Sequence, residues 1–126
     1  MIAVEQICVW CEELPHATRD NVFGEQTNLY RIGGKMFALV NVDPGNLVTL
    51  KVLPEDGEAL RATYSFVKPG YYMDKRHWVS VDTTADVPGE ELSALIEDSY
   101  QLVRASLTKK LRDSLGGSTQ PIGEPN

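Results

Sequence analysis

Residues 29–42 read LYRIGGKMFALVNV, two apolar runs on either side of a glycine pair. Paired glycines can adopt the positive φ angles of a two-residue type I′ turn, so this stretch predicts a β-hairpin. Turn-forming residues follow at 43–46, and residues 47–53 predict another strand, in which Thr49 and Lys51 alternate with apolar neighbours. The centre of the fold is therefore predicted to be an antiparallel meander of three strands.

Helical periodicity surrounds these strands. At the N-terminus, apolar residues recur at spacings of three and four and stop at Pro15, which predicts an amphipathic helix. A short helix is expected from Pro54 to about Tyr64, because proline fits the first helical position and acidic residues favour a helix N-terminus. A long helix is expected from Pro88, with one apolar stripe that continues to Leu111.

The remaining segments complete the predicted order. Residues 16–27 are polar and turn-rich and predict an ordered loop that leads into the sheet. Residues 66–76 predict a second loop, dense in aromatic and basic side chains, with a turn at Pro69-Gly70. Alternation over residues 77–83 predicts a strand. The order helix, three strands, helix, one or two strands, helix predicts an antiparallel sheet with helices on one face, a two-layer α+β domain over residues 1–115. Residues 116–126 are expected to be a disordered tail, because they contain two prolines and no periodic pattern.

Length and composition indicate one globular domain. The chain is 42% hydrophobic and 24% charged, and this composition is outside the range of disordered chains. A chain of 126 residues is also long enough to bury a core without a disulfide or a metal. No apolar run approaches the ~18 residues that span a bilayer, and the N-terminus has no signal-peptide pattern. We therefore expect a cytoplasmic protein without a membrane partner. The oligomeric state stays open, with a monomer favoured.

The charge is unevenly distributed along the chain. A net charge of −6 argues against a general binder of polyanions. However, residues 28–80 hold seven basic side chains against five acidic ones, whereas residues 81–103 hold six acidic and no basic side chains. The middle of the chain is therefore where an anionic partner could bind.

Motifs for catalysis or metal binding are scarce. Cys8 and Cys11 form a CxxC pattern, but both fall on the apolar stripe of the first helix with no room for a strand before them. Core packing is therefore favoured over a redox or zinc site. His16 and His77 are the only histidines, and no nucleophile elbow, dinucleotide motif or P-loop occurs. We expect neither an enzyme nor a cofactor or metal.

Residues 68–78, KPGYYMDKRHW, combine basic and aromatic side chains. Cations neutralise phosphates and aromatic rings stack on bases, so the segment indicates nucleic-acid binding. The alternative is that the aromatic rings belong to the core and that the cations are solvated or paired with nearby acids. Residue types alone do not decide between the two.

The chain resembles the MmcQ/YjbR family in three blocks. These are RIGGKMFA at residues 31–38, PGYYMDKRHW at residues 69–78, and SYQLV at 99–103 followed by LTKK at 107–110. The resemblance runs from the first helix to about Leu115. Asp74 stands where the family usually has Asn, and Thr108 stands where Pro is common.

The resemblance implies a CyaY-like or secretion-chaperone-like fold and a DNA-binding role of the double-wing kind. It places the contacts to DNA at six residues: Lys35, Lys68, Lys75, Arg76, His77 and Trp78. Because the protein as a whole is acidic, we expect DNA binding to be weak and salt-sensitive. The rival hypothesis is a protein-interaction module that uses the sheet surface or the acidic segment 81–103. A third is a small-molecule or enzymatic cleft near Tyr71, His77 and Trp78.

Overall fold

The computed structural model describes residues 1–43, 45–71 and 73–115. Its helices are α1 (Val4–Glu12), α2 (Pro54–Thr63), α3 (Gly89–Ala105) and α4 (Lys109–Ser114). Its strands are β1 (Thr18–Asp20), β2 (Thr27–Ile32), β3 (Lys35–Asn41), β4 (Leu47–Lys51), β5 (Val67–Pro69) and β6 (Trp78–Asp82). The strands form one antiparallel sheet in the order β1-β2-β3-β4-β6-β5. The predicted tail, residues 116–126, lies outside the described residues.

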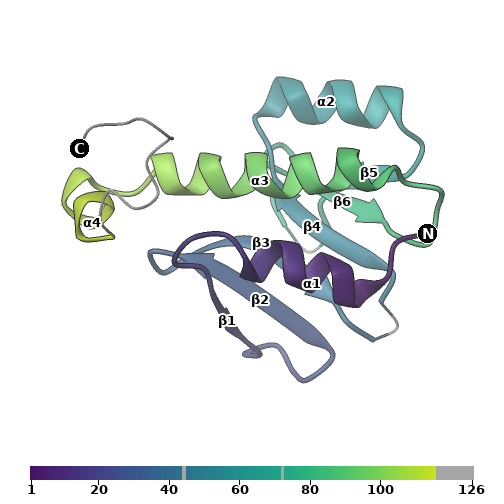
Figure 1. Cartoon of the computed structure of the whole chain (residues 1–126). Coiled ribbons are helices and arrows are strands. Elements are labelled where there is room, and N and C mark those ends of the chain that lie inside the picture. The colour runs from purple at the N-terminus through teal and green to yellow at the C-terminus, as the bar shows by residue number, and fades with distance from the viewer. Residues whose placement is uncertain (44, 72, 116–126) are drawn as a thin grey trace.

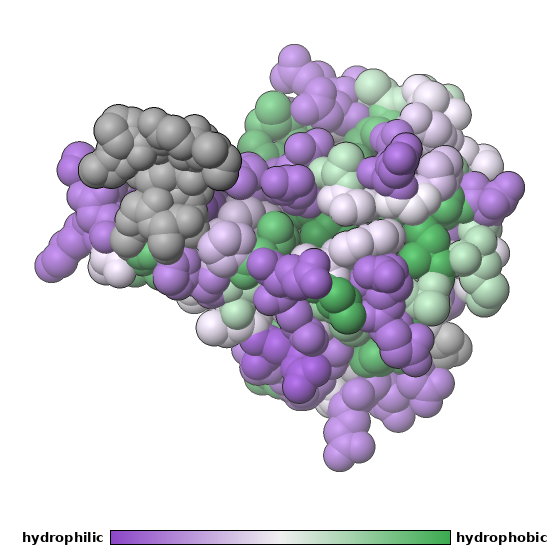
Figure 2. Space-filling view, in the orientation of Figure 1, coloured by the Kyte–Doolittle hydropathy of each residue, from purple (hydrophilic) through white to green (hydrophobic). Residues whose placement is uncertain are grey.

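The helices α1, α2 and α3 lie on one face of the sheet, and α4 lies beyond the end of α3 (Figure 1). This arrangement confirms the predicted α+β architecture with helices on one face. The helix side of the molecule carries mostly hydrophilic side chains with hydrophobic patches between them (Figure 2). Within the described ranges, no helix is long and apolar enough to cross a membrane.

Apolar side chains from the helices and from the inner face of the sheet form the core. The Phe37 ring packs edge-on against Tyr100 of α3, with ring centroids 5.4 Å apart. Largest among the fully buried side chains of this core are Tyr30, Tyr100, Phe37, Ile7, Ile32, Leu50, Leu92 and Ile96. Each burial of this kind stabilises the fold by about 1.5–3 kcal/mol relative to an exposed side chain.

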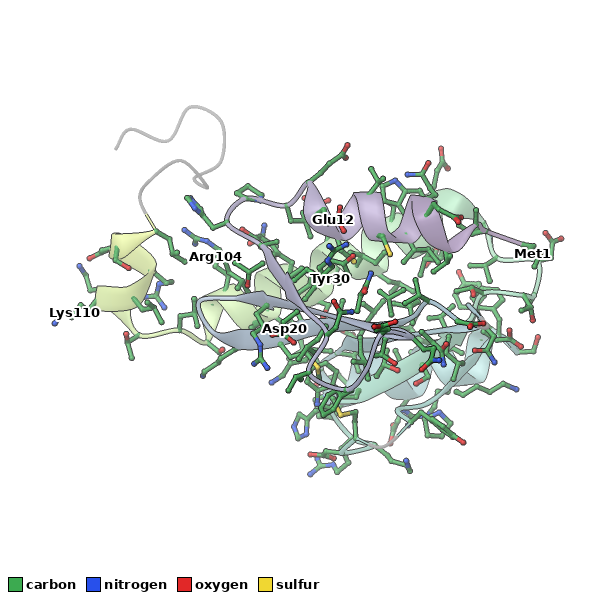
Figure 3. All side chains as sticks on the ribbon, turned by 90° about the horizontal axis from the view of Figure 1, so that it is seen from below. Met1, Glu12, Asp20, Tyr30, Arg104 and Lys110 are labelled. Carbon is green, nitrogen blue, oxygen red and sulfur yellow. The ribbon has the colours of Figure 1, made fainter. Side chains whose placement is uncertain are left out.

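The CxxC pattern belongs to this core. Cys11 is fully buried, which confirms its predicted core packing, and burial raises the pKa of its thiol so that it stays protonated. Cys8 is half-buried and its Sγ accepts a hydrogen bond from Asn28 Nδ2 at 3.4 Å. Beside it, the buried Tyr30 hydroxyl donates to Glu12 of α1 at 2.8 Å (Figure 3). These contacts join α1 to the sheet.

The predicted hairpin joins β2 and β3, and its glycines have φ angles of +59° and +85°. Beyond the turn, Tyr30 pairs with Ala38 but Arg31 pairs with Met36, so Phe37 is an extra residue in β3. Ser99 of α3 supports this bulge, because its hydroxyl donates to Phe37 O at 2.6 Å and accepts from Lys51 N at 2.8 Å. A bulge bends its strand, so β3 curves at this point.

Three predicted segments differ from the structure. The predicted loop at 16–27 contains β1, and the predicted loop at 66–76 contains β5. The long C-terminal helix is two helices, because the chain turns after α3 and Thr108 starts α4 by accepting the Leu111 amide at its hydroxyl. The short helix is confirmed, with Pro54 at its first turn and Tyr64 at its C-terminal cap.

Candidate binding groove on the open face of the sheet

The strand register decides which side chains lie on the sheet face without helices. Leu29 of β2 is opposite Leu39 of β3, which is opposite Thr49 of β4, and Thr49 is opposite Ser80 of β6. Paired residues share a face, and their neighbours along each strand, such as Tyr30, belong to the core below the helices. These four side chains therefore form a row across the open face.

The loop between β5 and β6 is here called the 70–77 loop, and its described residues, 70, 71 and 73–77, cover one side of this face. Its Gly70 N–H donates to Trp78 O at 2.9 Å, and the Tyr71 N–H donates to the Ser80 hydroxyl at 2.9 Å. A Cβ atom on Gly70 would lie 2.6 Å from the Trp78 Cβ, so only glycine permits this close return. The Ser80 and Thr49 hydroxyls lie 2.7 Å apart beneath the loop and are both buried.

The loop between β1 and β2, residues 21–26, forms the other side. Asn21 Nδ2 donates to Thr27 O and to Asn28 Oδ1, both at 2.8 Å, which fixes the end of the loop to β2. The Phe23 side chain is 67% exposed at the edge of the open face. An exposed ring of this size beside a concave apolar surface is typical of an interaction site.

Between the two loops lies a groove of about 720 Å³, here called the sheet groove. Apolar side chains provide most of its walls, with few polar groups between them. The lining consists of Phe23, Thr27, Leu29, Arg31, Met36, Leu39, Asn41, Leu47, Thr49, Tyr71 and Met73. A concave apolar groove of this volume with few polar groups is the usual form of a binding site.

Arg31 is the cation among the lining residues, and its charge is already compensated. Its Nε donates to Asp20 Oδ2 at 3.0 Å, and one of its terminal nitrogens donates to Gly34 O at 3.1 Å. The hydrogen bond from Arg31 lowers the pKa of Asp20, so this carboxyl stays ionised. The groove therefore offers apolar contact rather than uncompensated charge.

The structure places three of the predicted DNA-binding residues, Lys75, Arg76 and His77, within the 70–77 loop. Lys75 Nζ donates to Gly70 O at 2.6 Å. The Asp74 carboxylate accepts the Arg76 N–H at 2.9 Å and lies 2.8 Å from His77 Nδ1. These contacts lower the pKa of Asp74, the Arg76 N–H contributing most. Asp74 therefore stabilises the loop turn.

The other predicted residues are more dispersed. Trp78 is half-buried, and Lys51 Nζ lies 5.6 Å from its ring centroid, so one ring already has a cation beside it. Lys68 is exposed on β5, opposite Ser80. Lys35 is exposed at the start of β3, on the opposite face of the sheet from Met36, which lines the sheet groove. The structure does not bring Lys35 together with the 70–77 loop.

Reasoning from the sequence did not identify the groove residues Phe23, Leu29 and Leu39. A signal was present, because adjacent positions such as Leu29 and Tyr30 are both apolar, which indicates a strand covered on both faces. A second signal was Phe23, a large apolar ring within a polar loop. Neither signal shows that the two loops enclose a groove, because that depends on the order of the strands.

Comparisons with known proteins agree with this fold. The YjbR family model matches residues 12–102. The protein YbdF of Escherichia coli O157:H7 is 38% identical over 104 residues, which cover 78% of this chain and 81% of YbdF. The crystal structure of Deinococcus radiodurans protein DR2400 has 34% identity and a TM-score of 0.87, covering 100% of this chain and 96% of that one. A crystal structure from Pseudomonas syringae has 26% identity and a TM-score of 0.67 and covers 79% of this chain and 97% of that one. The chain therefore belongs to the YjbR family.

Proposed function

We propose that this protein is a non-enzymatic interaction module that holds an apolar segment of a partner protein in the sheet groove. The observation that carries the proposal is the groove itself, about 720 Å³ between two loops, with the exposed Phe23 and Tyr71 at its edges. Aromatic side chains are enriched at protein interfaces, and tyrosine is among the residue types that most often dominate binding energies. Compensation of the Arg31 charge by Asp20 favours an apolar partner over a charged one.

Selection of peptides tests this proposal. A random peptide library would be selected against the full chain, and the binders compared between the wild type and a Phe23→Ser/Tyr71→Ser double variant. Both side chains are more than half exposed, so the substitutions leave the core intact. We expect apolar and aromatic peptides whose affinity falls at least about tenfold in the variant, because hot-spot aromatics contribute roughly 1–2 kcal/mol each.

Val9→Ser provides the matched control. Val9 is 43% exposed on α1, away from the sheet groove. Its replacement should leave the affinity of the selected peptides unchanged. The proposal fails if the library yields no binders, or if the double variant binds the selected peptides as well as the wild type.

DNA binding at the loop rim is a second candidate function. The observation in its favour is that two cations are exposed, Arg76 two residues before Trp78 and Lys68 opposite Ser80 on the neighbouring strand, and exposed cations contact phosphates. Titration of duplex and single-stranded oligonucleotides at two salt concentrations tests it. Each phosphate contact adds about 0.9 to the log–log salt dependence on duplex DNA, so Lys68→Ala/Arg76→Ala should lower the slope. An unchanged slope, or no binding at low salt, removes this candidate.

A further inference from the structure

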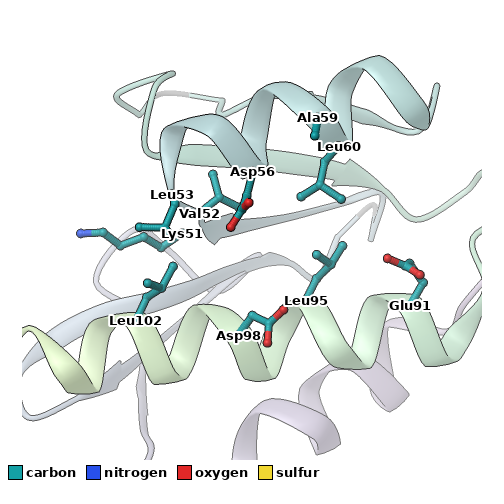
Figure 4. A pocket seen from close by; sticks show the side chains of 10 residues that line it. All are labelled: Lys51, Val52, Leu53, Asp56, Ala59, Leu60, Glu91, Leu95, Asp98 and Leu102. Atoms are coloured by element: carbon teal, nitrogen blue, oxygen red, sulfur yellow. The ribbon is translucent and has the colours of Figure 1, made fainter.

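A second groove lies on the opposite side of the molecule, between α2 and α3. It has a volume of about 270 Å³ and is here called the helix groove (Figure 4). Leu60 of α2 and Leu95 of α3 point toward each other across it, and Leu53 and Leu102 lie at one end (Figure 4). The centre of the groove is therefore apolar.

Carboxylates line both edges of the helix groove. Asp56 extends from α2, and Glu91 and Asp98 extend from α3 (Figure 4). Glu91 and Asp98 are seven residues apart, which places them two helical turns and about 10 Å apart on the same side of α3. The groove thus has acidic groups on both sides of an apolar centre.

Basic side chains do not offset these acids. Lys51 also lines the groove, but its Nζ is directed away from the interior and lies 5.6 Å from the centroid of the Trp78 ring (Figure 4). Across α1, α2 and α3, nine side chains are acidic and two, Arg61 and Arg104, are basic. The helix side therefore attracts cationic partners and repels anionic ones.

We propose that the helix groove binds a basic amphipathic helix of a partner protein. Apolar side chains at positions i, i+4 and i+7 of that helix would enter the groove between Leu60 and Leu95. Lysine or arginine residues beside this stripe would meet Asp56 on one edge and Glu91 and Asp98 on the other. This surface is separate from the sheet groove, so the inference does not depend on the proposed function.

The probe is a synthetic 18-residue peptide of leucine and lysine with leucines at this spacing, labelled with fluorescein for polarisation measurements. Two further peptides test the chemistry: one has glutamate in place of lysine, and the other has serine in place of leucine. We expect the leucine–lysine peptide to bind, and both others to bind at least about tenfold more weakly. Equal binding of the serine–lysine peptide would show attraction by charge alone and would overturn the proposal.

Two pairs of substitutions on α3 localise the binding. Glu91→Gln/Asp98→Asn removes the charges that line the groove, whereas Glu90→Gln/Glu97→Gln removes two acids on the same helix that do not. The net charge changes equally in both variants. We expect the affinity for the leucine–lysine peptide to fall about threefold to tenfold in the Glu91→Gln/Asp98→Asn variant and less than about twofold in the Glu90→Gln/Glu97→Gln variant. Equal losses of affinity in the two variants would refute the helix groove as the site. Addition of the leucine–lysine peptide in an NMR titration gives a second test, and changes in amide chemical shift confined to the sheet groove would also refute it.

Discussion

Ser99→Ala tests the connection between α3 and the β3 bulge. The Ser99 side chain is fully buried, and its hydroxyl is bonded to Phe37 O at 2.6 Å and to Lys51 N at 2.8 Å. Alanine leaves both backbone groups without this partner. Each unsatisfied buried polar group costs about 1–3 kcal/mol. The cost for the Lys51 amide lies at the lower end of this range, because Lys51 is half-buried and water can replace the lost partner. We therefore expect the free energy of unfolding to fall by about 2–4 kcal/mol.

Urea denaturation followed by circular dichroism measures this loss. Thermal unfolding should give a melting temperature lower by roughly 8–16 °C, at about 4 °C per kcal/mol for a domain of this size. Ser93→Ala is the matched control on the same helix, because Ser93 makes no side-chain hydrogen bond within the described residues. Its effect should stay within about 0.5 kcal/mol.

Hydrogen exchange at the Lys51 amide provides a second measurement. Loss of the Ser99 acceptor should accelerate exchange at this amide in the alanine variant, whereas the Ser93 variant should leave it unchanged. Equal stabilities of the two variants, together with unchanged protection of the Lys51 amide, would refute the bridging role of Ser99.

Three further predictions concern the loops and the core. Gly70→Ala should lower the free energy of unfolding by about 1–3 kcal/mol, because the new Cβ would lie 2.6 Å from the Trp78 Cβ. Gly89→Ala is the control, because a Cβ there has its nearest contact at 3.7 Å, and thermal unfolding should show no loss of stability. In a carboxyl NMR titration Asp74 should have a pKa below its usual value, because it accepts the Arg76 N–H. Its stabilising contacts should therefore persist above about pH 4 and be lost as the pH falls through the lowered pKa, and titration at the usual value would contradict this. In a Cys8→Ser variant the remaining thiol, Cys11, should react with a thiol reagent only after denaturant is added, because burial raises its pKa; rapid labelling of the native protein would contradict its core position.

Local patterns predicted most of the fold because they depend on neighbouring residues. The glycine pair fixes the hairpin, and Pro54 fixes the start of α2. By contrast, β1 and β5 have three residues each, too few for alternation to be visible, and their strand character comes from pairing with β2 and β6. The C-terminal apolar stripe runs through the break before Thr108, so periodicity alone does not reveal two helices.

The site was harder to predict because it depends on contacts between distant segments. Thr49 and Ser80 have the alternation of solvent-facing positions, yet both are buried beneath the 70–77 loop. Asp74 reads as an acid within a basic segment, but the folded loop uses its carboxylate to bind the Arg76 amide. The predicted basic residues are at the surface, whereas the groove beside them comes from the loop geometry.

The two shortest strands also determine how the sheet ends. The edge strands β1 and β5 offer only three residues each to an incoming strand, and Pro69 in β5 has no N–H to donate. Exposed Arg19 and Lys68 add charge at the two borders. Short, charged borders of this kind disfavour fibre growth by strand addition from other molecules. A concentrated solution of the folded protein should therefore resist amyloid-like assembly, even though one face of its sheet exposes an apolar groove.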